Sequence, residues 1–454
     1  MAHAQSRVHL FRFSRPHATG VTAFMRETSI WRILHHARNR YWLKRLSEFG
    51  VWQVASQALQ LVTGFLLVRW MTMEAYAQYG LALGFQNMLG QLVDVGFSSS
   101  IIALVGSRNS EPDVVGRYTQ AANQLRNVVL LAFSPVAALA FFGFARAHGW
   151  PIATSTVLFL SIVAYLYFQG WVSCYSAPLL IHQRIKTLYA PAVTLNASKL
   201  CMCWLAHAVA TLGAGFVSGL NALTSLTTAF MYKAHASDLL VVSDKADPNA
   251  MREIRKYVAP LAPGIIFYAL QGQLQIFLIS LFGKTQSIAE VVALGRLSQI
   301  LILFSALNST IFAPLLARAP VHDTPRKYAL ALSFNIGIAT ILTGGAFYLP
   351  SVFLFILGPN YTHLKEELLL SVAGSSLWYI SGSLFAFNNA RRWNYHWTSY
   401  ANVVGLIAIQ AWLCFLLDLS SPRQVLILSV ITAGYPILVF AATAVYGYRN
   451  SERT

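Results

Sequence analysis

Long apolar runs separated by short polar segments constrain this chain more than any other feature. Such runs recur along most of its 454 residues, for example at 61–70, 128–142, 265–282 and 425–445. A helix needs about 20 mostly apolar residues to cross a bilayer. Only 11% of the residues are charged, against about 25% in soluble domains. The alternating segments of about ten residues that form membrane barrels do not occur in the sequence. We therefore predict an all-α polytopic membrane protein.

The apolar runs divide the chain into about twelve predicted transmembrane helices. They lie near residues 47–70, 76–105, 127–147, 152–180, 187–209, 211–232, 257–282, 287–316, 328–350, 367–389, 397–417 and 424–447. We expect two six-helix lobes joined by a hydrophilic linker. The predicted parts are a basic cytoplasmic tail at 1–46, an N-terminal lobe at 47–232, a cytoplasmic linker at 233–256, and a C-terminal lobe with a short cytoplasmic tail at 257–454.

The two predicted lobes share a weak internal repeat. Phe65–Leu83 aligns without gaps on Phe277–Gly295 and is identical to it at several positions. The first span of each lobe also carries three glutamines, which are Gln53, Gln57 and Gln60 in one lobe and Gln271, Gln273 and Gln275 in the other. Many transporters place a binding site between two such repeats.

The formal net charge of +17 fits membrane topology better than nucleic-acid binding. Most of the Lys and Arg residues fall on one side of the predicted spans, with Arg126 among them, so we place both termini in the cytoplasm. Within the tail 1–46, aromatic residues interleave with basic ones. This pattern suits either a helix on an anionic membrane surface or a disordered tail that fixes topology.

The four cysteines all lie within predicted spans, and they have neither the spacing of a disulfide framework nor that of a metal site. Gly283-Lys-Thr285 lacks the upstream glycine of a phosphate-binding loop. We predict neither a metal nor a bound cofactor.

Polar side chains recur at helical spacing inside several spans. Those that we assign to a substrate cavity, besides the deep charges, are Gln53, Gln57, Gln60, Asn87, Gln91, Gln271, Gln275 and Gln299. Buried polar groups in a membrane either bond neighbouring helices or face a wet cavity. Because the stripes occur in both lobes, we favour a hydrated central cavity.

Three charges, Asp94, Lys199 and Arg296, lie inside predicted spans. Each costs at least about 2.5–3.5 kcal/mol at the bilayer centre. One interpretation is a structural salt bridge. The other is that the two cations attract an anionic ligand while Asp94 titrates or switches partners. Asp94 and His207 are candidates for ion or proton coupling, although His207 also suits a hydrogen-bonded packing role.

The first two spans resemble those of polysaccharide flippases in the multidrug/oligosaccharidyl-lipid/polysaccharide exporter superfamily. The resemblance rests on residues 65–83 and 92–100, in which Arg69, Glu74, Asp94, Gly96 and Ser98 stand at matching positions. Ala77 departs from the family's glycine after the first tyrosine. The resemblance implies two six-helix lobes around a cavity that opens alternately to either membrane face. It also implies a bacterial inner-membrane location and coupling to a proton or sodium gradient.

The resemblance implies that the substrate is a lipid-linked oligosaccharide or polysaccharide intermediate. Membrane lipids and other polysaccharide assembly proteins are the further expected partners. A multidrug exporter of the same superfamily is the first alternative, but organic cations call for buried acids, and Asp94 is the one acid that we place deep. A polysaccharide polymerase or ligase is the second alternative, and the short predicted outer loops argue against such an enzyme.

Overall fold

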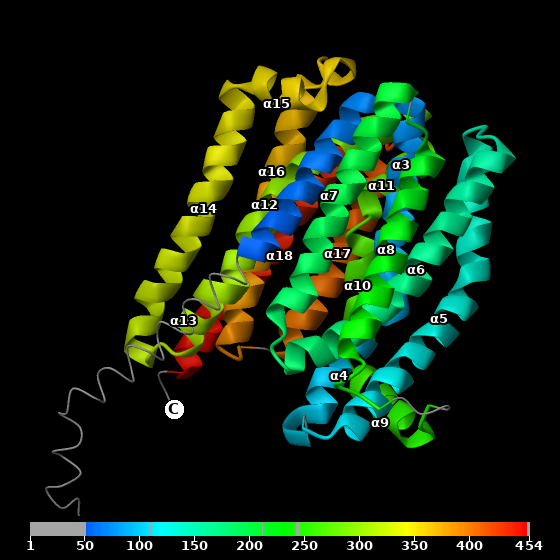
Figure 1. Ribbon diagram of the computed structural model, residues 1–454. Helices are drawn as coiled ribbons and strands as arrows, with labels where there is room; N and C mark the ends of the chain where they lie inside the picture. The colour runs from blue at the N-terminus through cyan, green and yellow to red at the C-terminus, as the bar shows by residue number, and fades with distance from the viewer. Residues whose placement is uncertain (1–50, 109, 211, 242–245, 394, 452–454) are drawn as a thin grey trace, which may run out of the picture. The chain divides into compact units, whose positions relative to one another are not determined.

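The structure is a computed structural model that describes residues 51–451, apart from residues 109, 211, 242–245 and 394. The predicted tail at 1–46 lies outside the described residues. The described part of the chain is mostly helical and contains no β-strand (Figure 1). The predicted all-α class is confirmed.

The N-terminal half contains a helix at Val51–Trp70, followed by α3 (Met73–Asp94), α4 (Phe97–Val105), η1 (Gly106–Arg108), α5 (Pro112–Ala147), α6 (Ile152–Ile181), α7 (Ile185–Val209) and α8 (Ala214–Ala236). The short helix α9 (Pro248–Val258) leads to the C-terminal half. That half contains α10 (Ala262–Gln271), α11 (Leu274–Phe282), α12 (Thr285–Leu307), η2 (Asn308–Phe312), α13 (Ala313–Ala317), η3 (Val321–Asp323), α14 (Thr324–Tyr348), α15 (Pro350–Leu357), η4 (Pro359–Tyr361), α16 (Lys365–Ala390), α17 (His396–Leu416) and α18 (Pro422–Ser451).

Each predicted span coincides with a helix or a broken helix. Among the described residues, nine helical segments are long and apolar enough to cross a membrane, and the bent pair α10–α11 makes a tenth. Helices α7 and α8 are also long enough, with 25 and 23 residues. They are less apolar because they carry polar side chains such as Lys199 and Asn221. This is a multi-pass membrane protein with two six-helix lobes.

Two predicted spans are interrupted. The second breaks between α3 and α4, where Val95 and Gly96 have φ angles of 41° and 94°. The seventh bends by 50° between α10 and α11, at residues 272–273. Pro263 lies in the first turn of α10, ahead of this bend, where a proline removes no hydrogen bond of the helix.

The helices pack mainly within their own half. In the N-terminal half, α6 lies against α3, α5 and α8, and in the C-terminal half α16 lies against α12, α14 and α18 (Figure 1). The halves meet where α3 packs on α10, α11 and α12. Gly80 makes the close approach possible, because a Cβ atom there would lie 2.6 Å from Cγ1 of Val292.

The predicted linker at 233–256 is partly helical. Helix α9 begins after Asp247, whose carboxylate accepts the backbone N–H of Asn249 at 2.9 Å. Its buried face consists of Ala250, Ile254 and Val258, and it packs against α4 and α5. An amphipathic helix therefore rests on the N-terminal lobe at this point.

Candidate functional site

Polar residues from both halves line three adjoining cavities. The N-half cavity, of about 400 Å³, has Gln60, Tyr79, Asn87, Tyr165, Asn196, Lys199, Asn221, Arg296 and Gln299 among its lining residues. The C-half cavity, of about 530 Å³, includes Asn87, Tyr268, Gln271, Gln273, Gln275, Arg296, Gln299 and Trp378. The Asp94 cavity, of about 370 Å³, includes Asn87, Gln91, Asp94, Arg126, Gln169 and Gln273. Asn87 lines all three, so the cavities adjoin one another at α3.

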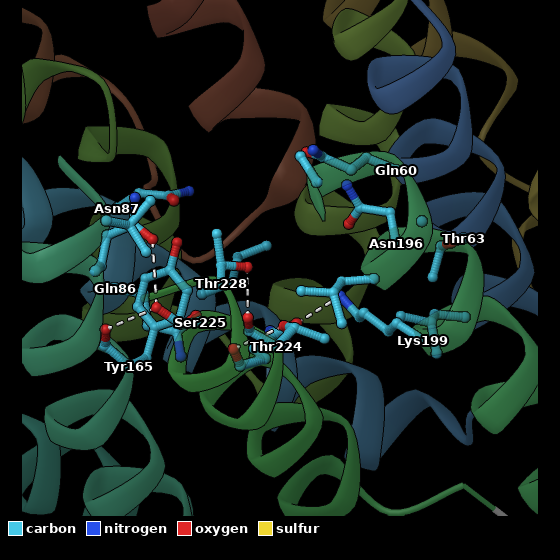
Figure 2. Close-up of a pocket in the computed structure, with 18 of the residues that line it drawn as sticks. Gln60, Thr63, Gln86, Asn87, Tyr165, Asn196, Lys199, Thr224, Ser225 and Thr228 are labelled. Atoms are coloured by element: carbon cyan, nitrogen blue, oxygen red, sulfur yellow. Dashed lines mark hydrogen bonds between the residues drawn. The ribbon is translucent and has the colours of Figure 1, made fainter. Parts of the chain in front are cut away.

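Lys199 projects from α7 into the N-half cavity, where Figure 2 shows it among polar side chains. Its ammonium group donates a hydrogen bond to the Asn221 side chain on α8. Asn221 is buried, and its amide oxygen is neutral. Because an ammonium group has three donors, this bond leaves donor capacity for a ligand.

Arg296 lies on α12 at the boundary between the N-half and C-half cavities. Its side chain is 7% exposed. Its Nε–H donates to the hydroxyl of Tyr76 at 3.0 Å, and its guanidinium carbon lies 5.8 Å from the centre of the Tyr79 ring. Its Nη2 has no hydrogen-bond partner. Two tyrosines of α3 thus hold the arginine in place, and its buried Nη2 is left without a hydrogen-bond partner.

The walls of these two cavities carry positive charge. Among the described residues, the lining of the N-half and C-half cavities includes no Asp or Glu. Lys199, Arg296 and Tyr79 all line the N-half cavity, and the Arg296 guanidinium lies over the Tyr79 ring. A buried cation without a carboxylate partner attracts anions strongly because the low dielectric weakens screening. The N-half cavity can therefore bind an anionic group.

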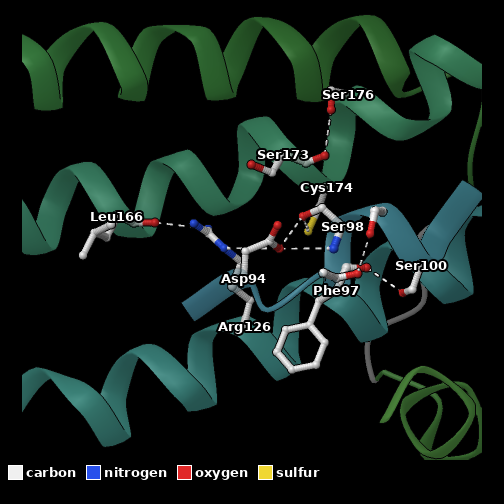
Figure 3. Close-up of polar contacts among 11 residues, drawn as sticks. Asp94, Phe97, Ser98, Ser100, Arg126, Leu166, Ser173, Cys174 and Ser176 are labelled. Carbon is white, nitrogen blue, oxygen red and sulfur yellow. Dashed lines mark hydrogen bonds and ion pairs between the residues drawn. The ribbon is translucent and has the colours of Figure 1, made fainter. Parts of the chain in front are cut away.

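Asp94 has a different environment from the two cations (Figure 3). Its carboxylate lies 3.8 Å from Nε of Arg126 on α5, and Nη1 of the same arginine donates to the backbone oxygen of Leu166 at 3.1 Å. Arg126, which we placed at the cytoplasmic end of a predicted span, is 2% exposed and therefore lies buried between helices. The structural salt bridge that we weighed for Asp94 is present.

The Asp94-Val-Gly96-Phe-Ser98 sequence of the flippase resemblance forms a cap at the helix break. Gly96 has a φ angle of 94°, which only glycine adopts without strain. Ser98 donates its N–H and its Oγ–H to Asp94 at 3.1 and 2.8 Å. The carboxylate thereby satisfies free donors at the start of α4. Asp94 is 27% exposed and lines its cavity while making all of these bonds.

The structure brings most of the predicted cavity residues together. Those that line at least one of the three cavities are Gln60, Asn87, Gln91, Asp94, Lys199, Gln271, Gln275, Arg296 and Gln299. Gln57 and His207 line none of them. The His207 ring stacks on Trp70 with centroids 4.9 Å apart. Gln53 is a half-buried residue in the first turn of the helix Val51–Trp70.

Several wall residues were not predicted. Helix α8 presents Asn221, Thr224, Ser225 and Thr228 to the N-half cavity, and their helical spacing is a polar stripe that could have been recognised in the sequence. No sequence pattern marked the aromatic wall residues Tyr79, Tyr165 and Trp378. Aromatic residues are also common where membrane helices face the bilayer, so their presence in a span does not indicate a cavity.

Asp94 is not the only deep acid. Glu290 on α12 is 6% exposed and receives hydrogen bonds from the Gln286 amide at 2.9 Å and from the His363 ring at 3.1 Å. It lines none of the three cavities. Within the part of the chain that the structure describes, no group of three or more His, Cys, Asp or Glu residues could hold a metal ion.

No protein family model and no curated protein sequence matches the chain. Solved structures do match it. The chain is similar to the lipid II flippase MurJ in an inward closed conformation, with a TM-score of 0.66 and 14% identity over 88% of each chain. It is also similar to the eukaryotic MATE transporter AtDTX14, with a TM-score of 0.63 and 14% identity over 90% of this chain and 98% of that one.

A third match is an outward-facing multidrug resistance MATE transporter of the MOP superfamily, with a TM-score of 0.54 and 11% identity over 90% of this chain and 97% of that one. All three neighbours are transporters or flippases. The chain therefore shares its fold with these transporters. The resemblance seen in its first two spans is confirmed at that level.

Proposed function

We propose that the protein is a flippase that moves a lipid-linked oligosaccharide or polysaccharide intermediate across a bacterial inner membrane by alternating access. The observation that carries the proposal is the pair of cations, Lys199 and Arg296, on one cavity wall whose described residues include no carboxylate. The diphosphate of a lipid-linked saccharide is an anion that such a wall would bind, with the arginine suited to bidentate contact.

The structural neighbours support the class but not the substrate. One is a lipid II flippase and others are multidrug transporters. A cavity that binds organic cations would need carboxylates beside aromatic rings. The wall of the N-half cavity carries positive charges in place of carboxylates, and this favours the flippase over the multidrug exporter.

The remaining parts of the proposal follow from the predicted topology. Both termini would lie in the cytoplasm, and the partners would be the lipid-linked saccharide, membrane lipids and other polysaccharide assembly proteins. A proton or sodium gradient would drive the cycle, with Asp94 as the candidate coupling group because it is the acid that lines a cavity.

Deletion of the gene tests the proposal. We expect loss of a surface polysaccharide and accumulation of the lipid-linked intermediate in the inner leaflet of the membrane. The native chain and a Lys186→Gln variant should restore the polysaccharide, whereas Lys199→Gln should not. Lys186 is an exposed lysine on the same helix, so it controls for the loss of one charge.

Three results would contradict the flippase. Unchanged surface glycans would exclude the assigned substrate class. An intermediate that is flipped but not polymerised or ligated would indicate an enzyme of assembly. Altered drug susceptibility with normal glycans would favour the multidrug exporter.

A further inference from the structure

The C-half cavity differs chemically from the N-half cavity that it adjoins. Its wall is formed by α10, α11, α12 and α16, with one face of α3. Arg296, at the shared boundary, is the only charged residue among those that the structure describes in its lining. The rest of the wall carries amides, hydroxyl groups and aromatic rings. Such a wall suits a neutral polar ligand, because neutral polar groups need hydrogen bonds but no counter-charge.

Hydrogen bonds from side chains of α17 fix two polar groups of this wall in position. The Gln410 amide on α17 donates to the Gln271 side-chain oxygen at 2.8 Å, and Asn402 on the same helix donates to the Tyr268 hydroxyl at 2.7 Å. Both receiving groups act as acceptors in these bonds. These bonds use neither the Gln271 amide N–H₂ nor the Tyr268 hydroxyl hydrogen as a donor. Groups fixed in this way bind a ligand with little loss of side-chain entropy.

Trp378 on α16 adds a flat apolar surface to this polar wall. The ring is half-buried and lines the cavity. An indole supplies an apolar face together with one N–H donor. A sugar ring has a complementary arrangement, with C–H groups on its faces and hydroxyl groups around its edge. An aromatic face flanked by amides is the combination that matches it.

We propose that the C-half cavity is the saccharide subsite of the flippase, with Trp378 as the stacking surface for an uncharged sugar. This inference rests on the proposed function. The diphosphate would lie at Lys199 and Arg296 in the N-half cavity, and the first sugars would lie across Arg296 in the C-half cavity. Asn87 lines both cavities, so the two positions adjoin each other at α3. The subsite would select for neutral sugars near the diphosphate and against anionic ones, which need a counter-charge.

Binding to the purified full-length protein in lipid nanodiscs tests the division of the two cavities. The probes are undecaprenyl diphosphate without a sugar, and the same lipid carrying one neutral hexose, glucose or galactose. We expect the native chain to bind at least one hexose-bearing lipid on the order of tenfold more tightly than the bare lipid. Trp378→Ala should remove this increment and leave binding of the bare lipid unchanged. Trp378→Phe should retain part of the increment.

The control is Trp412→Ala, because Trp412 on α17 is 62% exposed and lines neither cavity. It should preserve both affinities. If the native chain binds the bare lipid but gains nothing from either hexose, the saccharide subsite is refuted while the proposed function stands. The subsite is also refuted if Trp378→Ala and Trp378→Phe both keep the increment. If the native chain does not bind bare undecaprenyl diphosphate at all, the proposed function itself fails.

Discussion

Arg296 on α12 donates its Nε–H to the Tyr76 hydroxyl on α3 at 3.0 Å, and this bond joins the two halves of the molecule. The arginine therefore has two roles to test. It lines the N-half cavity, in which an anion would bind, and it contacts the opposite lobe. In an alternating-access cycle one lobe moves against the other, so a contact between the lobes should change during transport.

Replacement of Arg296 separates these roles. Arg296→Ala should abolish polysaccharide export in a complemented deletion strain because it removes the cation from both cavities. Arg296→Lys should restore export only in part, since it keeps the charge but loses the planar fork. Tyr76→Phe removes only the bond between the lobes and should slow export less than Arg296→Ala does. Immunoblots verify abundance, and Arg318→Ala, an exposed arginine beyond α13, serves as the control. Full export by Arg296→Ala at normal abundance would show that transport does not require this arginine and that its role is structural.

Neutralising Asp94 should destabilise the protein. Asp94→Asn leaves the buried Arg126 without its ion partner; because Asp94 is itself 27% exposed, the loss should stay below the roughly 3–5 kcal/mol of a fully buried pair. The thermal midpoint in detergent should fall accordingly. Adding Arg126→Met should restore much of the stability, because an apolar side chain then replaces the uncompensated charge. We expect export by the double variant to stay impaired and its pH dependence to change, since the cavity carboxylate is still missing. Complete recovery of export would rule out a coupling role for Asp94.

The contact between α3 and α12 depends on the absence of a side chain at Gly80. Gly80→Ala would place a Cβ atom 2.6 Å from Val292, and overpacking of this kind costs about 1–3 kcal/mol. Val292→Ala in the same chain should relieve the clash. Gly219→Ala is the control, because a Cβ atom there meets nothing within 4 Å. Thermal unfolding of the four proteins measures the effect. Equal midpoints for Gly80→Ala and the native chain would show that the helices separate without cost.

Asp238, in the turn after α8, provides a pH test outside the membrane-spanning segments. Its hydrogen bonds from the Arg184 guanidinium lower the pKa of the carboxyl below its ordinary value of 3.8. A lowered pKa means that the stabilisation is present above about pH 3.8 and is lost as the pH falls through the lower, folded-state value. Asp238→Asn should therefore slightly lower the thermal midpoint at neutral pH. The difference should shrink below pH 3.8 and in about 1 M salt, which screens exposed pairs. A midpoint difference that is the same at all pH values would contradict this.

The sequence predicted the helices well because hydropathy reports where helices can cross a membrane. It also identified Lys199 and Arg296, because a charge in an apolar run must face the interior. It did not identify their surroundings. Arg126 lies at the polar end of an apolar run, just before the predicted span 127–147, so we placed it on the cytoplasmic side. Its burial follows from packing between α3, α5 and α6, which no local pattern encodes. The helix breaks at Gly96 and at residues 272–273 lie inside continuous apolar runs. Because the hydropathy does not fall at these positions, it could not reveal the breaks.

We propose above all that Lys199 and Arg296 bind the anionic head group of the lipid while the protein moves it across the membrane. The most direct measurement uses the purified protein in vesicles that contain undecaprenyl diphosphate linked to a fluorescent oligosaccharide, with a pH or sodium gradient imposed. A membrane-impermeant quencher reports how much label reaches the outer leaflet. The account predicts that the native chain and Lys186→Gln expose the protected label with time, while the double variant Lys199→Gln/Arg296→Gln leaves it protected. Equal exposure by the double variant and the native chain would contradict the account.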